Sequence, residues 1–202
     1  MMKKKILKAL AIVGCAVLLV AGSIAGTFAY LTSLTGTVTN TFTAGNVKIT
    51  LDEAIVDEYG NVITGDGAGR TSEGRTYKLI PGHEYVKDPT IHVSGDSEDC
   101  WLFVKINNGI SAVETDGATT IANQMSSGGW SVIDAYAGIY AYNTKVSANA
   151  NIVVFEYFKV SGEADISNLN NAKIEVTAYA IQADGFGTAQ AAWEAAPATW
   201  NA

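Results

Sequence analysis

Two histidines and a neighbouring glutamate are the residues of this sequence best suited to metal chemistry. His83 directly precedes Glu84, and His92 is the second of the two histidines in the chain. Zinc peptidases place two histidines four residues apart on a helix with a glutamate between them, so that both imidazoles face one metal. Here the histidines are nine residues apart, and Pro81 and Pro89 surround the site, which excludes such a helix. Zinc binding would need neighbouring strands to bring the three residues together; we prefer to interpret both histidines as ordinary surface residues.

Carboxylates gather in two short stretches that are candidates for calcium, because Ca²⁺ binds several oxygen ligands at once. Neither stretch has the ligand spacing of an EF-hand loop. In an acidic chain such stretches are ordinarily solvated turns, and we interpret both in this way, so that no cofactor is expected. The two stretches consist of Asp96, Glu98 and Asp99, and of Asp52, Glu53, Asp57 and Glu58.

The sequence contains only two cysteines, which limits the disulfide and thiol chemistry open to it. Of the two cysteines, Cys15 lies in an apolar leader, so Cys100 alone remains if the leader is removed, and one cysteine cannot form an internal disulfide. Cys100 opens the apolar run 100–104, which predicts a small buried residue at the start of a strand. The alternatives are an intermolecular bridge and a reactive thiol. No Gly-x-Ser-x-Gly nucleophile elbow is present in the sequence, and no catalytic residue is predicted.

The charge balance restricts the partners. The formal net charge is −7, and removal of the four lysines at positions 3–8 leaves 9 basic against 20 acidic residues, a net charge of −11. Nucleic acids and anionic lipids require a basic surface. The balance therefore argues against both partners and fits a secreted or cell-surface protein.

The first 29 residues have the organisation of a secretory signal. A basic segment at residues 3–8 precedes an uncharged, mostly apolar stretch at residues 9–29, which ends in small residues. We predict cleavage after Ala29, which makes Tyr30 the first residue of the mature chain. The apolar stretch is also just long enough for a membrane-spanning helix, so an uncleaved anchor through residues 9–29 is the alternative.

The elements that must position these side chains are predicted to be strands. Residues 47–51 alternate apolar and polar residues, as a strand with one buried face does, and residues 173–181 repeat this alternation. The run 101–106 predicts a central strand buried on both faces. Residues 85–93 are extended, and Pro89 predicts an edge or bulged strand there. Further short strands are predicted at 77–80, 130–133, 138–142 and 152–158.

Helices are few and short in this prediction. One is expected around residues 118–125, and another at residues 188–195 with Thr188 as its N-cap. Residues 57–76 are polar and rich in glycine, which predicts a long surface loop. Eight or nine strands joined by turns indicate an all-β, antiparallel β-sandwich over residues 46–202. Strand spacing alone permits either a jelly-roll or an immunoglobulin-like topology.

Several segments resemble the TasA/camelysin family, exported proteins of Gram-positive bacteria whose leaders are removed by a SipW-type signal peptidase. The long leader runs into residues 27–33 (Thr-Phe-Ala-Tyr-Leu-Thr-Ser), and residues 40–53 follow with Asn-Thr-Phe-Thr-Ala-Gly-Asn-Val-Lys-Ile-Thr-Leu-Asp-Glu. The likeness recurs at Leu-Ile-Pro-Gly (79–82) and at Ala-Tyr-Ala-Ile-Gln-Ala-Asp-Gly-Phe (178–186). The resemblance implies a jelly-roll fold and a structural role in a biofilm matrix.

The preferred hypothesis is a fibre-forming surface or matrix protein. Residues 30–45 form an extended segment that could add as a donor strand to an open sheet edge of a second copy. Its apolar side chains would fill pockets on that copy: Leu31, Leu34, Val38 and Phe42. Head-to-tail addition does not close on itself and therefore makes a filament. The alternatives are a camelysin-type metallopeptidase, which needs a metal and a further ligand, and a binding module anchored at the cell surface.

Overall fold

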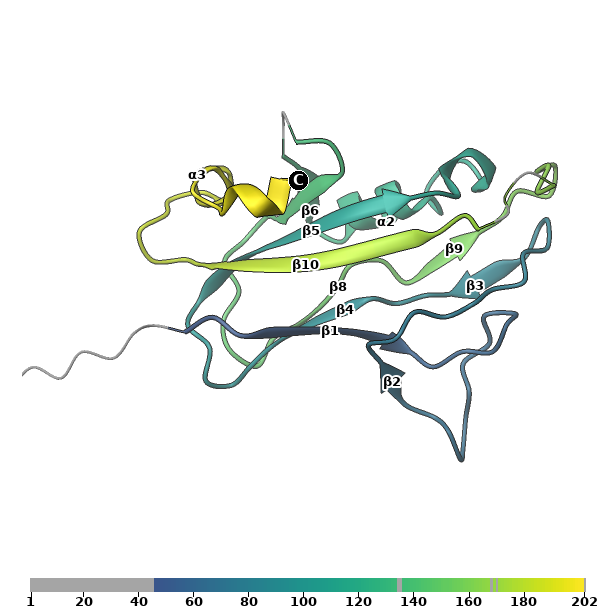
Figure 1. Ribbon diagram of the computed structural model, residues 1–202, viewed down its shortest axis with the longest axis horizontal. Helices are drawn as coiled ribbons and strands as arrows, with labels where there is room; N and C mark the ends of the chain where they lie inside the picture. Colours follow the sequence, from purple (N-terminus) through teal and green to yellow (C-terminus); the bar gives the residue numbers. More distant parts are fainter. Residues whose placement is uncertain (1–45, 134–135, 168, 170, 202) are drawn as a thin grey trace, which may run out of the picture. The chain divides into compact units, whose positions relative to one another are not determined.

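The computed structural model describes residues 46–133, 136–167, 169 and 171–201, and within them the fold is all-β with antiparallel sheets (Figure 1). The predicted leader, the cut after Ala29 and the donor segment up to residue 45 lie outside these residues. The strands are β1 (Ile49–Ala54), β2 (Arg70–Thr71), β3 (Glu84–Val86), β4 (Thr90–Val93), β5 (Cys100–Asn108), β6 (Trp130–Val132), β7 (Ile139–Tyr142), β8 (Asn151–Val153), β9 (Tyr157–Lys159) and β10 (Ile174–Gln182).

The described strands form three sheets. One four-stranded sheet has the order β2-β1-β4-β8, and a second has the order β10-β5-β7-β6. β3 and β9 form a separate two-stranded sheet. Every pairing is antiparallel, and the longest joins β5 to β10 over nine residue pairs, from Ile174 opposite Asn108 to Gln182 opposite Cys100.

The predicted central strand is confirmed, since β5 lies between β10 and β7 and both of its faces are buried. Leu102 and Val104 belong to a large apolar cluster that also contains Ile91 and Val93 of β4. Trp101 and Phe103, on the other face, belong to a second cluster. The first cluster therefore contains residues from both four-stranded sheets, and the second covers the opposite face of the β5 sheet.

The alternation predicted for the last strand is also confirmed. Ile174, Val176, Ala178 and Ala180 of β10 pack against the first cluster, while Tyr179 and Ile181 pack against the second. Helix α3 (Ala189–Glu194) supplies Trp193, a fully buried indole at the centre of the second cluster. An alternating strand thus separates two cores because successive side chains point to opposite faces.

Three strand predictions need correction. The single strand predicted at residues 152–158 is wrong, because the chain divides there into β8 and β9, which belong to different sheets. The edge strand predicted around Pro89 is wrong, because the chain breaks there into β3 and β4, and β4 is an inner strand between β1 and β8. Pro89 precedes β4, so its missing N–H costs no ladder hydrogen bond. The strand predicted at residues 77–80 is absent. Instead the Tyr85 hydroxyl donates to the carbonyl of Lys78 and accepts from the N–H of Ile80, which replaces a ladder with side-chain bonds.

The short helices lie close to their predicted positions. The helix expected around residues 118–125 is α2 (Ile121–Ser127), capped by the side chain of Thr120. The predicted N-cap at Thr188 is confirmed, since its hydroxyl accepts from the N–H of Ala191. Two single turns of 3₁₀ helix, η1 (Ser111–Val113) and η2 (Ala198–Asn201), complete the helical content described. Across the residues that the structure describes, no helix has the length and apolar character needed to cross a membrane.

Candidate functional site

A buried ion pair is the most unusual polar feature of the domain. The ammonium of Lys87 donates to Oε2 of Glu53 at 2.5 Å, and the two side chains are 9 % and 10 % exposed. The second carboxylate oxygen of Glu53, Oε1, is buried and has no hydrogen-bond partner among the residues that the structure describes. Charged side chains are rarely buried this far, and an unsatisfied buried acceptor is costly. The ion pair between Lys87 and Glu53, with its unbonded oxygen, is therefore the centre of the candidate binding site.

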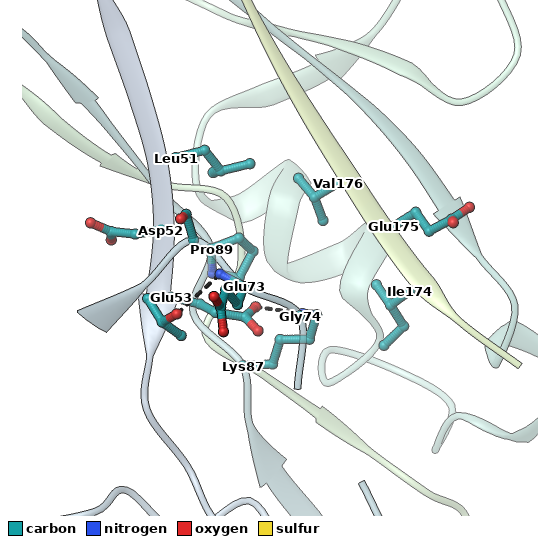
Figure 2. A pocket seen from close by; sticks show the side chains of 12 residues that line it. Leu51, Asp52, Glu53, Glu73, Gly74, Lys87, Pro89, Ile174, Glu175 and Val176 are labelled. Carbon is teal, nitrogen blue, oxygen red and sulfur yellow. Dashed lines mark hydrogen bonds and ion pairs between the residues drawn. The ribbon is translucent and has the colours of Figure 1, made fainter. Parts of the chain in front are cut away.

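The ion pair forms part of the wall of a pocket with a volume of about 280 Å³. One side is β1 with Leu51 and Glu53, and the opposite side is β10 with Ile174 and Val176 (Figure 2). The pocket therefore lies between an inner strand of one four-stranded sheet and the outermost strand of the other. The remaining lining residues come from the segment 71–74 and from the junction of β3 and β4: Thr71, Ser72, Glu73, Gly74, Lys87 and Pro89, together with Asp52 and Glu175.

Strand periodicity explains why Glu53 is buried. Val47, Ile49 and Leu51 pack against the first apolar cluster, and the next residue of the same parity is Glu53. The same logic applies to Lys87, which follows the fully buried Tyr85 by two residues. Sequence reasoning placed Glu53 in a solvated acidic stretch. Extension of the alternation beyond residue 51 was the signal that would have placed it on the inner face.

Arg70 connects the strands beside the pocket through hydrogen bonds to three side chains. Its guanidinium donates to Oδ1 of Asp52 at 2.5 Å and to Oδ2 of Asp88 at 2.6 Å. It also donates to the hydroxyl of Thr90 at 2.8 Å. Burial alone would lower the pKa of Arg70, but the hydrogen bonds to the two carboxylates outweigh it and raise the pKa. One cation thereby joins β2 to β1 and β4 beside the pocket.

Asp52 and His92 share this network on the outer face of β1. The imidazole Nε2 of His92 lies 2.9 Å from Oδ1 of Asp52, and its Nδ1 lies 2.6 Å from the side-chain oxygen of Asn151. Burial would raise the pKa of Asp52, but hydrogen bonds from Arg70 and His92 outweigh it and hold the pKa below its usual value. The hydrogen bond to Asp52 is the largest influence on His92 and raises its pKa.

The three zinc candidates have separate partners. Nε2 of His83 lies 2.9 Å from the carbonyl oxygen of Tyr59, and its ring packs edge-on against Tyr85. Glu84 is exposed on β3, while His92 belongs to the network around Asp52. Within the described residues no group of three or more His, Cys, Asp or Glu side chains is arranged to hold a metal ion.

The acidic stretches are divided among local partners. Asp96 forms an exposed ion pair with Lys48, and this hydrogen bond is the main cause of its lowered pKa. Asp57 accepts from the side chain and backbone of Asn61, which lowers its pKa and closes a turn. The neighbouring carboxylates of residues 52 and 53 point to opposite faces of β1, one to the Arg70 network and one to the pocket.

Cys100 is placed as predicted, as a buried residue that begins β5. Burial, with a smaller effect of the Asp99 carboxylate, raises the pKa of its thiol to about 11. The thiolate is the nucleophilic form of cysteine. The position therefore suits a core residue and offers no nucleophile at neutral pH.

Comparisons with known proteins provide no relative for this chain: no family model, no curated protein and no solved structure matches it.

Proposed function

We propose that this protein is an exported surface or matrix protein that assembles into fibres by strand addition. The observation that carries the proposal is the open edge of β10. This strand pairs with β5 along its whole length and has no second partner strand among the described residues. At about 3.4 Å per residue its nine residues present roughly 30 Å of unpaired backbone. Natural proteins usually blunt or cover an edge of this length, because it is a template for pairing with another chain.

The donor strand that we propose is residues 30–43 of a second copy. Fourteen residues are enough to cover the β10 edge, and the apolar side chains Leu31, Leu34, Val38 and Phe42 would reach the half-buried surface beside it. That surface exists on the acceptor side, where Leu51 and Val176 face the pocket between β1 and β10. Main-chain hydrogen bonds would supply affinity and the apolar side chains would set the register.

Two further parts of the proposal concern the leader and the topology. The leader would be cut after Ala29 by a SipW-type signal peptidase, as the resemblance to the TasA/camelysin family implies, so that the released segment becomes available as a donor. The two four-stranded sheets would pack face to face in a jelly-roll-like sandwich, which the shared apolar cluster supports. The intact mass of the secreted protein tests the cut: a first residue other than Tyr30 contradicts it. An experimental structure tests the packing, and sheets packed other than face to face would contradict the sandwich.

The assembly test uses the chain that starts at Tyr30. Sedimentation and electron microscopy should show filaments for this chain and monomers for a chain that lacks residues 30–42. The edge is tested by Thr177→Lys, since Thr177 is exposed on β10 and charged side chains at an edge oppose strand addition. Ala122→Lys is the matched control, because it adds the same charge on the exposed face of α2. A monomeric chain from Tyr30, unchanged by the deletion, would overturn the proposal.

A further inference from the structure

The pocket beside the buried ion pair carries an excess of negative charge. Two carboxylates belong to it, Glu53 in the wall and the exposed Glu73, while Lys87 is the one cation among the lining residues. Asp52 and Glu175 also line the pocket, but their carboxylates point away from it (Figure 2). These two have partners elsewhere, Arg70 and His92 for Asp52 and Asn107 for Glu175. The Glu73 carboxylate is therefore left without a counter-ion among the described residues.

The acceptor that would receive a ligand is Oε1 of Glu53, which is out of contact with solvent in the pocket wall, so the ligand would reach it through a turn of the Glu53 side chain. Lys87 holds the Glu53 carboxylate through Oε2, which leaves Oε1 buried without a donor. A carboxylate oxygen accepts hydrogen bonds only, so the group that satisfies it must carry an N–H or O–H. Charge-assisted bonds from an ammonium are stronger than neutral ones. One cationic nitrogen would supply both the donor that Oε1 of Glu53 lacks and a positive charge for the Glu73 carboxylate, since Lys87 already balances the charge of Glu53.

The apolar walls of the pocket favour an organic cation over a metal ion. Leu51, Pro89, Ile174 and Val176 contribute apolar surface opposite and beside the carboxylates. Hydrated metal ions gain nothing from apolar walls, and Ca²⁺ requires six to eight oxygen ligands. The described residues contain no cluster of three metal-binding side chains, at this pocket or elsewhere. The volume of about 280 Å³ lies at the lower limit for small-molecule sites, which suits a short alkyl chain.

We propose that this pocket binds an alkylammonium group, with its nitrogen on Oε1 of Glu53 and its alkyl chain against Leu51 and Val176. The exposed carboxylate of Glu73 attracts the same charge. The alkylammonium has two possible sources, a small free amine and the side chain of a lysine in another polypeptide, which present the same group to the pocket. The site does not require strand addition, but a donor strand that covers Leu51 and Val176 would compete with the ligand for the same surface.

The test is calorimetric titration of the purified protein at low salt with n-butylammonium and with Nα-acetyl-lysine methylamide, which keeps its side-chain ammonium. Neutral n-butanol serves as the comparison ligand, because it has the same chain without the charge. We expect saturable binding of one or both cations and at least tenfold weaker binding of butanol. Binding of n-butylammonium alone indicates a free amine as ligand, and binding of the lysine derivative alone indicates a lysine side chain.

Glu53→Gln replaces the acceptor with an amide that can present a donor, and should weaken cation binding at least tenfold. The double variant Glu53→Gln with Lys87→Met removes the whole ion pair without leaving a lone buried charge, so it remains testable if the single variant fails to fold. Glu163→Gln is the matched control, since it removes one exposed carboxylate that does not line the pocket. Absence of saturable binding of both cations would overturn the proposal, as would equal binding by the Glu53 variants or Ca²⁺ binding that amines do not displace.

Discussion

Loss of Lys87 should destabilise the domain more than loss of any exposed lysine. Lys87→Met leaves the Glu53 carboxylate buried at 10 % exposure, with neither oxygen bonded within the described part of the chain, since Oε1 has no partner there even in the parent protein. Each unsatisfied buried acceptor costs about 1–3 kcal/mol, and removal of one member of a buried pair costs about 3–5 kcal/mol. We therefore expect the free energy of unfolding to fall by about 4 kcal/mol.

The double variant Glu53→Leu with Lys87→Met separates this effect from a simple loss of packing. Replacement of both members of a buried pair by apolar residues of similar size is often neutral or stabilising. We expect the double variant to unfold within about 1 kcal/mol of the parent protein. Lys78→Met is the control, because Lys78 is exposed and approaches the ring of Tyr59 without an ion pair, and it should change stability by about 0.5 kcal/mol or less.

Urea denaturation followed by tryptophan fluorescence measures all three variants. Thermal unfolding provides a second measurement. For a domain of this size, 1 kcal/mol in the free energy of unfolding corresponds to roughly 2–4 °C in melting temperature, so Lys87→Met should melt roughly 10 °C below the parent protein. A change below about 1 kcal/mol for Lys87→Met would refute the reasoning. A double variant as unstable as the single one would also refute it, because the cost would then come from lost packing.

Three further outcomes follow from the packing and the charges. The Cys100 thiol should react with a thiol reagent at pH 8 only after addition of denaturant; rapid labelling of the folded protein would contradict its burial. The raised pKa of His92 implies a contribution to stability that is complete below pH 6.5 and disappears as pH rises through the folded-state pKa, so His92→Gln should flatten the fall in stability above pH 6.5; an unchanged profile would exclude the contact with Asp52 as its cause. Trp193→Ala should cost about 3–5 kcal/mol in urea unfolding, whereas Trp193→Phe, which retains a ring and removes an unpaired indole N–H, should cost much less; equal losses would argue against a packing role.

Local periodicity predicted much of the fold. The run at 101–106 indicated a strand buried on both faces, and the alternation at 173–181 indicated two faces that now lie against two different clusters. The N-cap at Thr188 was predictable for the same reason, because its side chain bonds a backbone N–H only three residues away. Each of these features depends on neighbours along the chain, so the sequence contains the needed information.

The predictions that failed depend on distant partners. Pro89 suggested an edge strand, but the chain breaks at the proline and β8 supplies the second neighbour of β4 from sixty residues further on. Residues 77–80 look like a strand, but the hydroxyl of Tyr85 bonds their backbone in place of a partner strand.

The candidate site shows the same division. Alternation along the chain predicted the strand at residues 47–51, and its continuation accounts for the inward face of Glu53, which had been assigned to a solvated acidic stretch. The partners of this residue follow only from tertiary structure: Lys87, 34 residues away, reaches Oε2, and among the described residues Oε1 is left without a donor. Tertiary structure likewise leaves the edge of β10 beside the pocket without a second partner strand among the described residues. Periodicity is a property of consecutive residues, whereas the partner of a charge or of a strand edge is set by which distant segments the folded chain brings together.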